Sequence, residues 1–413
     1  MPRFPNSARP PCVARHPDCS GLSSVMMWPV HTSKPRIMTV YGTRPEAIKV
    51  APVIAAIRHD ARFESIVVVT GQHREMLDQV NELFGITPDH DLDIFEPGAS
   101  LSTIFGRVLE RLDPVLVAEQ PDAVLVQGDT STVAAAALAA FHRQIPVIHL
   151  EAGLRSGDIT SPFPEEANRK VATQLAALHL APTATSRDNL LREGVAAGDV
   201  VVTGNTVIDA LLNAVEHKAP FTDPALEDLA DSGRRVLLVT THRRENWGDA
   251  MSGVGLALAR LAQAFPDVQI VLPAHRNPVV REAVLPHLVG LENVTVTEPL
   301  PYGEFTRMLG LATVVLTDSG GVQEEAPSLG KPVLVMRENT ERPEAVDAGT
   351  VRLIGTDEEL IVSSVTELLT SPTAYAAMAH AENPYGDGQA AARSVAAIAH
   401  LFGLGDRPQE FAL

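Results

Sequence analysis

The stretch RIMTVYGTRPEAIKVAPVIAAIRHD, residues 36–60, joins two hydrophobic periodicities across one glycine. Its first six residues form a short apolar and β-branched run, which is typical of a buried strand. After Gly42 the apolar residues recur at helical spacing, and Pro45 suits the first turn of a helix. This stretch therefore predicts a strand, a tight turn and a helix, the repeating unit of parallel α/β sheets.

The same unit recurs along the chain and predicts an α/β fold with two doubly wound, Rossmann-like domains and an interdomain cleft. Further strand-like runs are ESIVVVTGQ at 64–72, DAVLVQGDT at 122–130, PVIHLEAG at 146–153, RRVLLVTTH at 234–242, VQIVLPAH at 268–275, TVVLTDSGG at 313–321 and KPVLVM at 331–336. We predict an N-terminal domain over 36–215, a polar linker over 216–233 and a C-terminal domain over 234–385. The last helix, in 386–413, is expected to cross back to the first domain.

Composition narrows the class of protein and its partners. The chain is 45% hydrophobic and 20% charged, with 33 Lys and Arg against 51 Asp and Glu, which gives a net charge of −18. That charge disfavours nucleic acid and anionic membranes as partners. No apolar run is long enough to span a membrane, and the only cysteines, Cys12 and Cys19, suit a reducing cytoplasm. Residues 1–35 are interpreted as a disordered extension, or as residues that precede the true translation start.

Two glycine turns at strand ends favour anion binding. In YGTRPEAIK, Arg44 and Lys49 lie at a helix start, where free backbone N–H groups attract phosphate. The alternative is an ordinary helix N-terminus. In DSGGVQEE, at 318–325, a glycine pair lets the backbone approach a phosphate, Ser319 can donate a hydrogen bond and Glu325 can accept from ribose hydroxyls. Ligands of open parallel sheets bind at these carboxyl ends of the strands.

Two further strand ends carry cations. His242, in THRRENWG, suits phosphate binding or proton transfer, or belongs to a solvated, salt-bridged turn. Arg342, in ENTERPEA, suits phosphate binding or caps a loop.

Carboxylates close two strand-like runs that are expected to be neighbours. Asp129 follows one run, Glu151 follows the next, and Glu165 and Glu166 come soon after in PFPEEANR. Converging carboxylates suit proton transfer, because burial and repulsion separate their pKa values. The alternatives are a helix cap for Asp129 and an acidic first turn for Glu165 and Glu166. Glu151 needs a cationic partner, for which Arg155 and Arg169 are the candidates.

Motif spacing argues against metal and nicotinamide chemistry. No H-E-x-x-H or C-x-x-C set occurs, no G-x-S-x-G elbow occurs, and no G-x-G-x-x-G follows the first strand. The sequence therefore predicts no cofactor and no metal ligand.

Nine ordered blocks together resemble the bacterial non-hydrolysing UDP-N-acetylglucosamine (UDP-GlcNAc) 2-epimerases, from about Arg36 to the last helix. The blocks are GTRPEAIKVAPV, TGQHREMLDQV, VQGDTST, HLEAGLRSGD, PFPEEANR, VTGNTVID, THRREN, PAHRNP and TDSGGVQEEAPSLGKPVLVMRENTERPEAV. The resemblance implies a GT-B-like fold and cofactor-free exchange of UDP-GlcNAc with UDP-N-acetylmannosamine (UDP-ManNAc). It implies elimination of UDP to 2-acetamidoglucal and re-addition, in the supply of cell-envelope polysaccharide precursors.

The resemblance also implies roles for individual residues. Asp129, Glu151 and Glu165 match the acid/base carboxylates, with Asp129 and Glu151 as proton carriers, and His242 would stabilise the departing diphosphate. Positions that match UDP-binding residues are Arg44, Lys49, His242, Phe305, Ser319, Gly320, Gly321, Glu325 and Arg342. Gln72, Arg243 and His275 match the site of a second, activating UDP-GlcNAc. A homodimer is expected by resemblance alone.

Three other functions compete with this hypothesis. A GT-B glycosyltransferase would share the UDP site but would need an acceptor cleft in place of convergent acids. A hydrolysing 2-epimerase would release free N-acetylmannosamine and UDP. A nucleotide-sugar sensor would bind without turnover.

Overall fold

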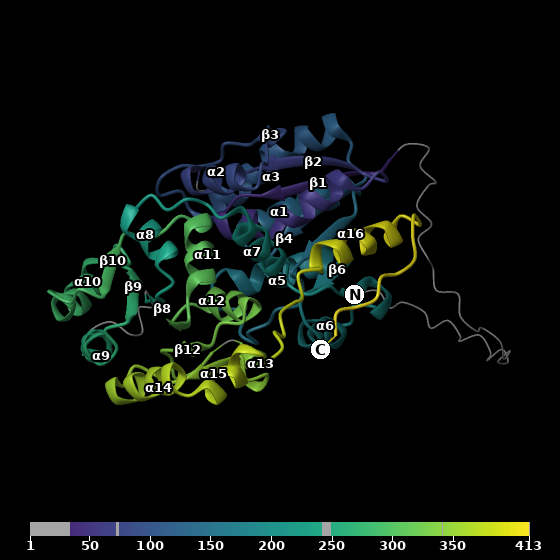
Figure 1. The fold of residues 1–413 in the computed structure, drawn as a ribbon. Coiled ribbons are helices and arrows are strands. Elements are labelled where there is room, and N and C mark those ends of the chain that lie inside the picture. The colour runs from purple at the N-terminus through teal and green to yellow at the C-terminus, as the bar shows by residue number, and fades with distance from the viewer. Residues whose placement is uncertain (1–33, 72–73, 242–248, 341, 413) are drawn as a thin grey trace, which may run out of the picture. The chain divides into compact units, whose positions relative to one another are not determined.

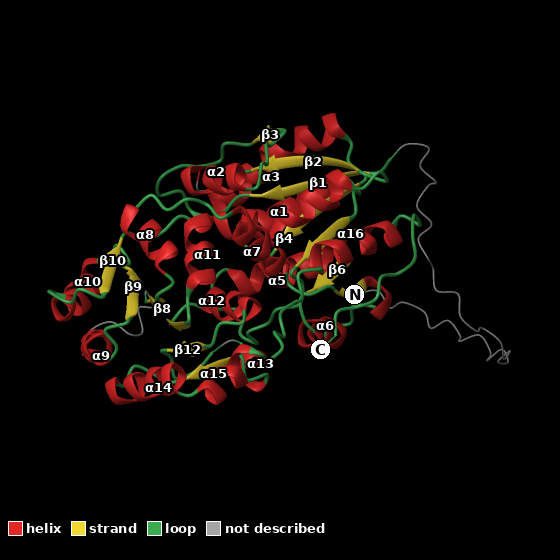
Figure 2. Cartoon of the chain, in the orientation of Figure 1, coloured by secondary structure: helices red, strands yellow, loops and turns green. Residues whose placement is uncertain are grey.

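The computed structural model describes residues 34–71, 74–241, 249–340 and 342–412, and Lys34–Leu413 form one compact unit. The described residues make two parallel sheets flanked by helices, as Figures 1 and 2 show. The first sheet has seven strands in the order β3-β2-β1-β4-β5-β6-β7, and the second has six in the order β10-β9-β8-β11-β12-β13. Every strand pairing is parallel. The α/β prediction with two doubly wound sheets is confirmed.

The bounds of the elements are as follows. The strands of the first sheet are β1 Arg36–Tyr41, β2 Glu64–Val69, β3 His90–Asp91, β4 Ala123–Gln127, β5 Val147–Leu150, β6 Ala176–Ala181 and β7 Val200–Val202. The strands of the second sheet are β8 Arg235–Thr240, β9 Val268–Pro273, β10 Val294–Thr297, β11 Val314–Thr317, β12 Val333–Val335 and β13 Val351–Leu353. The helices up to the second sheet are α1 Arg44–His59, α2 Arg74–Leu83, α3 Leu101–Glu119, α4 Ser131–His142, α5 Glu165–Leu175, α6 Ala184–Arg192, α7 Thr206–His217 and α8 Pro224–Ser232. The remaining helices are α9 Asp249–Ala264, α10 Pro278–Val284, α11 Tyr302–Leu311, α12 Gly320–Glu325, α13 Pro343–Asp347, α14 Glu358–Thr370, α15 Pro372–Ala379 and α16 Ala390–Leu401.

The strand β1 shows why the sequence reads as a continuous apolar run. Ile37 and Tyr41 pack into a core with α1 and α7, whereas Met38 and Val40 pack into a second core with α3 and α4. All four side chains are fully buried. Because helices cover both faces, neither face of the strand can be polar, which is the expected pattern of a buried parallel sheet.

The order of the strands reverses at one place in each sheet. In the first sheet the chain runs outward from β1 to β3 and then returns to β4 on the other side of β1. In the second sheet β8 and β11 are the corresponding neighbours. Loops that leave such a switch point diverge and open a crevice at the carboxyl ends of the strands. The described polar motifs after β1, β4 and β11 therefore lie at the two switch points.

The segment predicted as a linker, 216–233, differs from expectation because it contains the helix α8. Asp223 caps this helix by accepting a hydrogen bond from the backbone N–H of Ala225 at 2.9 Å. Pro224 occupies the first helical position, where its missing N–H costs nothing, so it starts a helix. The boundaries proposed for the domains stay a prediction.

The last helix, α16, packs against α1, α7 and β6 of the first sheet. Its N-terminus is held by Asp209 of α7, whose carboxylate accepts hydrogen bonds from the backbone N–H groups of Ala390 and Ala391. In the described part of the chain, no helix is both long and apolar enough to cross a membrane.

Candidate functional site

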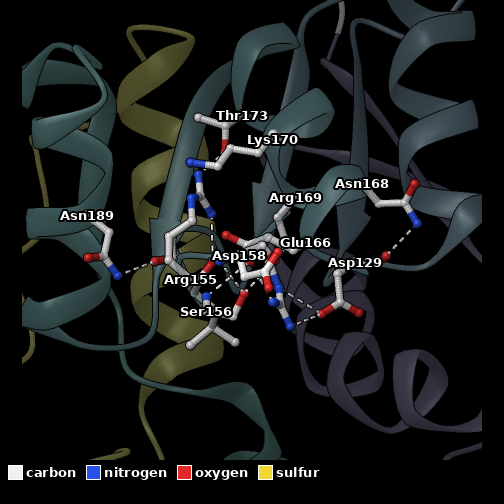
Figure 3. A network of polar contacts seen from close by, with 12 residues as sticks. Asp129, Arg155, Ser156, Asp158, Glu166, Asn168, Arg169, Lys170, Thr173 and Asn189 are labelled. Atoms are coloured by element: carbon white, nitrogen blue, oxygen red, sulfur yellow. Dashed lines mark hydrogen bonds and ion pairs between the residues drawn. The ribbon is translucent and has the colours of Figure 1, made fainter. Parts of the chain in front are cut away.

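The carboxylate Asp129 follows β4 at the switch point of the first sheet. Arg169 of α5 donates to its Oδ2 atom from Nε at 2.9 Å and from Nη2 at 2.6 Å (Figure 3). Asn168 donates to the Asp129 backbone carbonyl at 2.9 Å. Burial alone would lower the pKa of Arg169, but its ion pairs raise that pKa above the usual value. Asp129 is thus fixed from one side, and its Oδ1 atom makes no hydrogen bond to any described residue.

The two acidic residues that begin α5 have different surroundings. Glu166 is fully buried, and its Oε2 atom accepts from Arg169 at 2.9 Å and from the backbone N–H of Ser156 at 3.2 Å. Glu165 is half-buried and makes no ion pair with a described residue. The structure therefore connects Asp129 to Glu166 through Arg169 and leaves Glu165 unengaged at the start of the helix.

Glu151, at the end of β5, is held by donors from three separate elements. Lys49 of α1 lies 2.5 and 2.7 Å from its two carboxylate oxygens. Gln127 donates to Oε2, and Asn205 donates to Oε1 at 3.2 Å. The residue adopts a left-handed backbone conformation with φ 62°, which is unusual for a side chain other than glycine. Strain of this kind is concentrated at functional sites.

The predicted partners of Glu151 were wrong. Arg169 is engaged by Asp129 and Glu166, as described above. Arg155 pairs with Glu193 through two hydrogen bonds of 2.9 and 2.7 Å. It also donates to Thr173 (Figure 3). These hydrogen bonds from Arg155 are the main reason that the pKa of Glu193 falls to about 2. Arg155 braces the loop against α5 and α6, and Lys49 fills the role of counter-ion.

Lys49 consequently has a different environment from the phosphate site predicted for it. Its desolvation opposes the charged form, but the carboxylates of Glu151, Glu324 and Asp129 raise its pKa overall. The hydrogen bonds form two groups: Lys49, Gln127 and Asn205 around Glu151, and Asp129 and Glu166 around Arg169. The electrostatic interaction between Asp129 and Lys49 relates the two groups, and we call them together the carboxylate network.

A pocket of about 320 Å³ lies between the first residues of α1 and the switch point of the second sheet. Six predicted site residues line it: Arg44, His275, Phe305, Ser319, Gly321 and Glu325. The other residues that line it are Ile48, Thr240, Thr241, Pro273, Pro299, Leu300, Tyr302 and Val322. We call this cavity the pocket. Two aromatic rings, several aliphatic groups and a few convergent polar groups are typical of a site for an organic ligand.

Arg44 is the cation of the pocket. Burial lowers its pKa, and the nearby Tyr302 and Glu325 offset this only in part. Its guanidinium makes no hydrogen bond or ion pair of normal geometry with any described residue. A desolvated guanidinium with unused donors binds an anion strongly, because a phosphate or carboxylate restores the lost hydrogen bonds.

Glu325 and Glu324 form a buried acidic pair at the end of α12. Burial, with a further contribution from Glu324, raises the pKa of Glu325 to about 8, although Lys49 and Arg44 act in the opposite direction. Glu324 instead accepts from Arg342 Nε at 2.6 Å. The two carboxyls therefore differ in role: Glu325 faces the pocket, and Glu324 orients a cation.

Arg342 lies across the glycine turn that precedes α12. A Cβ atom added to Gly320 would lie 2.6 Å from Arg342 Nη1, so any larger residue there would require the guanidinium to shift. A Cβ at Gly321 would meet nothing within 4 Å, and this residue lines the pocket. The two glycines serve separate purposes: one admits the guanidinium and the other leaves the backbone open.

Three predicted residues, Gln72, His242 and Arg243, lie outside the described residues. Within the described ranges, no group of three His, Cys, Asp or Glu side chains is arranged to hold a metal ion.

Sequence reasoning missed Gln127, Asn205 and Tyr302. Gln127 is the last residue of β4 and Asn205 immediately precedes α7, so both occupy the strand-to-helix positions at which the other site residues were found. Attention to every polar residue at such a position would have found them. Tyr302 starts α11 after a proline, and no pattern in its surroundings marks it.

Comparison with known proteins agrees with this geometry. The family model described as UDP-N-acetylglucosamine 2-epimerase matches residues 55–399. The UDP-N-acetylglucosamine 2-epimerase of Escherichia coli K12 is 53% identical over 369 residues, which are 88% of this chain and 98% of the relative. A glycotransferase of kitacinnamycin, only 14% identical, matches with a TM-score of 0.61 over 89% of this chain and 99% of its own, which supports the GT-B-like fold alone.

Two solved structures are similar over nearly their whole length. The Neisseria meningitidis UDP-GlcNAc 2-epimerase bound to UDP-GlcNAc is 46% identical, with a TM-score of 0.77, 88% of this chain covered and 100% of its own. An S. aureus MnaA–UDP co-structure is 44% identical, with a TM-score of 0.78, 92% of this chain covered and 100% of its own. With a family model that spans most of the chain and a relative above half identity over most of it, this protein belongs to the UDP-N-acetylglucosamine 2-epimerase family.

Proposed function

We propose that this protein is an isomerase that interconverts UDP-GlcNAc and UDP-ManNAc by inverting C2 of the sugar. The observation that carries the proposal is the juxtaposition of the carboxylate network with the pocket. Lys49 joins them, since it pairs with Glu151 and interacts electrostatically with Glu324 and Glu325 of α12. The reaction needs both parts, because a proton must move at C2 while a diphosphate leaves C1.

In the first step a carboxylate removes the C2 proton. The electron pair of the broken C2–H bond forms the C1=C2 double bond of 2-acetamidoglucal, and the C1–O bond breaks so that UDP leaves with its electrons. The reverse step delivers a proton to the opposite face of C2 and re-forms the C1–O bond with the same UDP. Atoms and charges balance without an external oxidant or reductant.

Asp129 and Glu151 are the proposed proton carriers, with Glu165 as a third carboxylate nearby. Asp129 offers an Oδ1 atom that accepts from no described residue, so it can take a proton directly. Both oxygens of Glu151 are occupied by Lys49, Gln127 and Asn205, so Glu151 must exchange one hydrogen bond before it is protonated. Positioned acids and bases of this kind typically contribute about 10²–10⁴-fold to a rate.

The pocket is the proposed UDP site. Arg44 would bind a phosphate, Ser319 and the Gly321 backbone would donate hydrogen bonds, Phe305 would contact the uracil and Glu325 the ribose. Gly320 and Arg342 complete the proposed phosphate turn, and Lys49 would respond to the diphosphate through its ion pair. His242 remains proposed as the residue that stabilises the departing diphosphate.

Other features of the proposal rest on family membership. Gln72, Arg243 and His275 are the proposed binding residues for a second, activating UDP-GlcNAc, and His275 lines the pocket. A homodimer, a cytoplasmic location and a role in supplying cell-envelope polysaccharide precursors are likewise predictions.

Incubation with UDP-GlcNAc in D₂O tests the proposal. We expect UDP-ManNAc to form and deuterium to appear at C2 of both sugar nucleotides, as measured by NMR and mass spectrometry. The absence of both the product and the deuterium would contradict the proposal. Free N-acetylmannosamine with stoichiometric UDP would indicate a hydrolysing enzyme, transfer to an added acceptor would indicate a glycosyltransferase, and binding without turnover would indicate a sensor.

A further inference from the structure

Asn205 lies between the two sheets, in the turn that joins β7 to α7, and only 4% of it is exposed. Its backbone N–H donates to the carbonyl of Tyr385 at 2.7 Å. Its side-chain Oδ1 accepts from the backbone N–H of Val207 at 3.1 Å and so caps α7. Because the oxygen is committed to the cap, the amide cannot be reversed, and its NH₂ group must face the other way.

That NH₂ group donates to two carboxylates, one in the loop that follows a strand of the first sheet and one in a helix that follows a strand of the second. Asn205 Nδ2 lies 3.2 Å from Glu151 Oε1, after β5 of the first sheet, and 3.3 Å from Glu324 Oε2, in α12 after β11 of the second. A side-chain amide carries two N–H donors, so it can serve both acceptors at once. It does so without adding a charge between two anions.

Each of these carboxylates has its own cation on its far side. Lys49 pairs with Glu151 at 2.5 Å, and Arg342 donates to Glu324 at 2.6 Å. The titratable groups around Asn205 are therefore Glu151, Glu324, Lys49 and Arg342, with Glu325 next along α12. Asn205 is the neutral link in a chain of contacts that runs from Lys49 and Glu151 to Glu324 and Arg342.

We propose that Asn205 is a positioning residue that fixes the Glu151 carboxylate of the carboxylate network in register with the Glu324–Arg342 pair beside the pocket. This inference rests on the proposed function, in which Glu151 moves a proton while UDP departs from the neighbouring site. The amide sets the separation between the two sites through one rigid group.

The variant Asn205→Asp tests the proposal with little change in shape. Aspartate keeps the helix cap, because it is as good an N-cap as asparagine. It replaces the shared donor with a third anion between Glu151 and Glu324. We expect kcat to fall on the order of 100-fold, as for a misplaced catalytic group, whereas the dissociation constant of UDP changes far less. A matched control is Asp223→Asn, the reverse exchange at the half-buried cap of α8; it should leave kcat unchanged.

The pH profile separates positioning from a structural role. Clustered carboxylates share a proton at lower pH, and the introduced aspartate side chain can donate again once it is protonated. The kcat ratio of wild type to Asn205→Asp should therefore narrow from about pH 8 to about pH 6. Turnover within about twofold of wild type, or a pH-independent loss with an equal loss of UDP affinity, overturns the proposal.

A second variant covers the case in which Asn205→Asp does not fold, as judged by circular dichroism. Asn205→Ser keeps a capping oxygen but has only one O–H donor and no added charge. This variant should lose part of its kcat, and the kcat ratio of wild type to Asn205→Ser should stay the same between about pH 8 and about pH 6. Full turnover in Asn205→Ser overturns the proposal. If wild type itself exchanges no deuterium at C2, the proposed function fails. If wild type and Asn205→Asp exchange equally, only this inference fails.

Discussion

The carboxylate network and the pocket occupy equivalent positions on their sheets but satisfy their charges in opposite ways. In the carboxylate network, Lys49 and Arg169 are paired with Glu151 and Asp129 at 2.5–2.9 Å. In the pocket, Arg44 is half-buried with no ion pair to a described residue. The charges of the carboxylate network are satisfied by described residues, whereas Arg44 keeps donors for the phosphate that we propose it binds. Preorganised charge suits proton transfer, and unused donors suit the binding of a leaving group.

The largest expected effect follows from breaking the carboxylate network at Glu151. Glu151→Gln removes the proton carrier and should lower kcat about 10²–10⁴-fold, while UDP affinity stays near wild type because the pocket is intact. The melting temperature should also fall, since Lys49 loses its anion; breaking a buried pair costs about 3–5 kcal/mol. Steady-state kinetics and calorimetry with UDP measure the two effects. Asp113→Asn, at an exposed pair with Arg143, is the control, and near-normal kcat in Glu151→Gln would remove this residue from the mechanism.

The loop that carries Glu151 is the next place to break the network, through Gly153. This residue has φ 93°, and an added Cβ would lie 2.2 Å from the carbonyl oxygen of Ser186. Gly153 therefore allows the loop to approach α6 closely. Gly153→Ala should cost about 3 kcal/mol from the combined strain and overlap. Gly194→Ala, with φ 91° and nothing within 4 Å, isolates the backbone term. Equal losses of unfolding free energy in the two variants would refute the packing account.

A mutation in the pocket should weaken UDP binding without lowering stability, which is the opposite of the effect expected for Glu151→Gln. Arg44→Ala is expected to weaken UDP binding about 10–100-fold, since a hydrogen bond to a charged group is worth about 1.5–3 kcal/mol. Stability should hold or rise, because a desolvated cation without a partner is removed. Arg58→Ala, at the other end of α1, is the matched control, since Arg58 is exposed and donates only to the Thr87 carbonyl among the described residues. Unchanged UDP affinity in Arg44→Ala would remove Arg44 from the UDP site.

How far the sequence predicts this molecule differs between its fold and its site. Buried parallel strands read as apolar runs because helices cover both faces, so the alternation of strands and helices was recoverable from local pattern. The placement of Asp129, Glu151 and Ser319 at strand ends followed from the same pattern. The ion-pair partners of the site residues could not be predicted from local pattern. Lys49 and Glu151 are 102 positions apart, and they meet only because β1, β4 and β5 lie side by side.

Local pattern also could not predict how the burial or the structural role of single residues differs. Glu165 and Glu166 are adjacent in sequence, yet helix geometry buries one against Arg169 and leaves the other half-buried. The segment 216–233 was predicted as a polar linker, but Pro224 at the first position of α8 starts a helix there. In each case local composition is the same for both outcomes, and the tertiary neighbours decide between them.

The smallest expected effect concerns Glu325, the carboxyl at which the pocket approaches the carboxylate network. Its pKa of about 8 in the folded protein lies above the ordinary value of 4.5. Between those values the folded state holds a proton that the unfolded state releases, so this group makes stability fall as pH rises through that window. Glutamine mimics the protonated carboxyl at every pH. The melting temperature of Glu325→Gln relative to wild type should therefore rise from about pH 5 to about pH 8, by a few degrees at most. Thermal melts at several pH values measure it, with exposed Glu298→Gln as control. A difference that is constant with pH would show that Glu325 is already ionised when the pocket is empty, and the contrast between the two regions would then be smaller than the structure indicates.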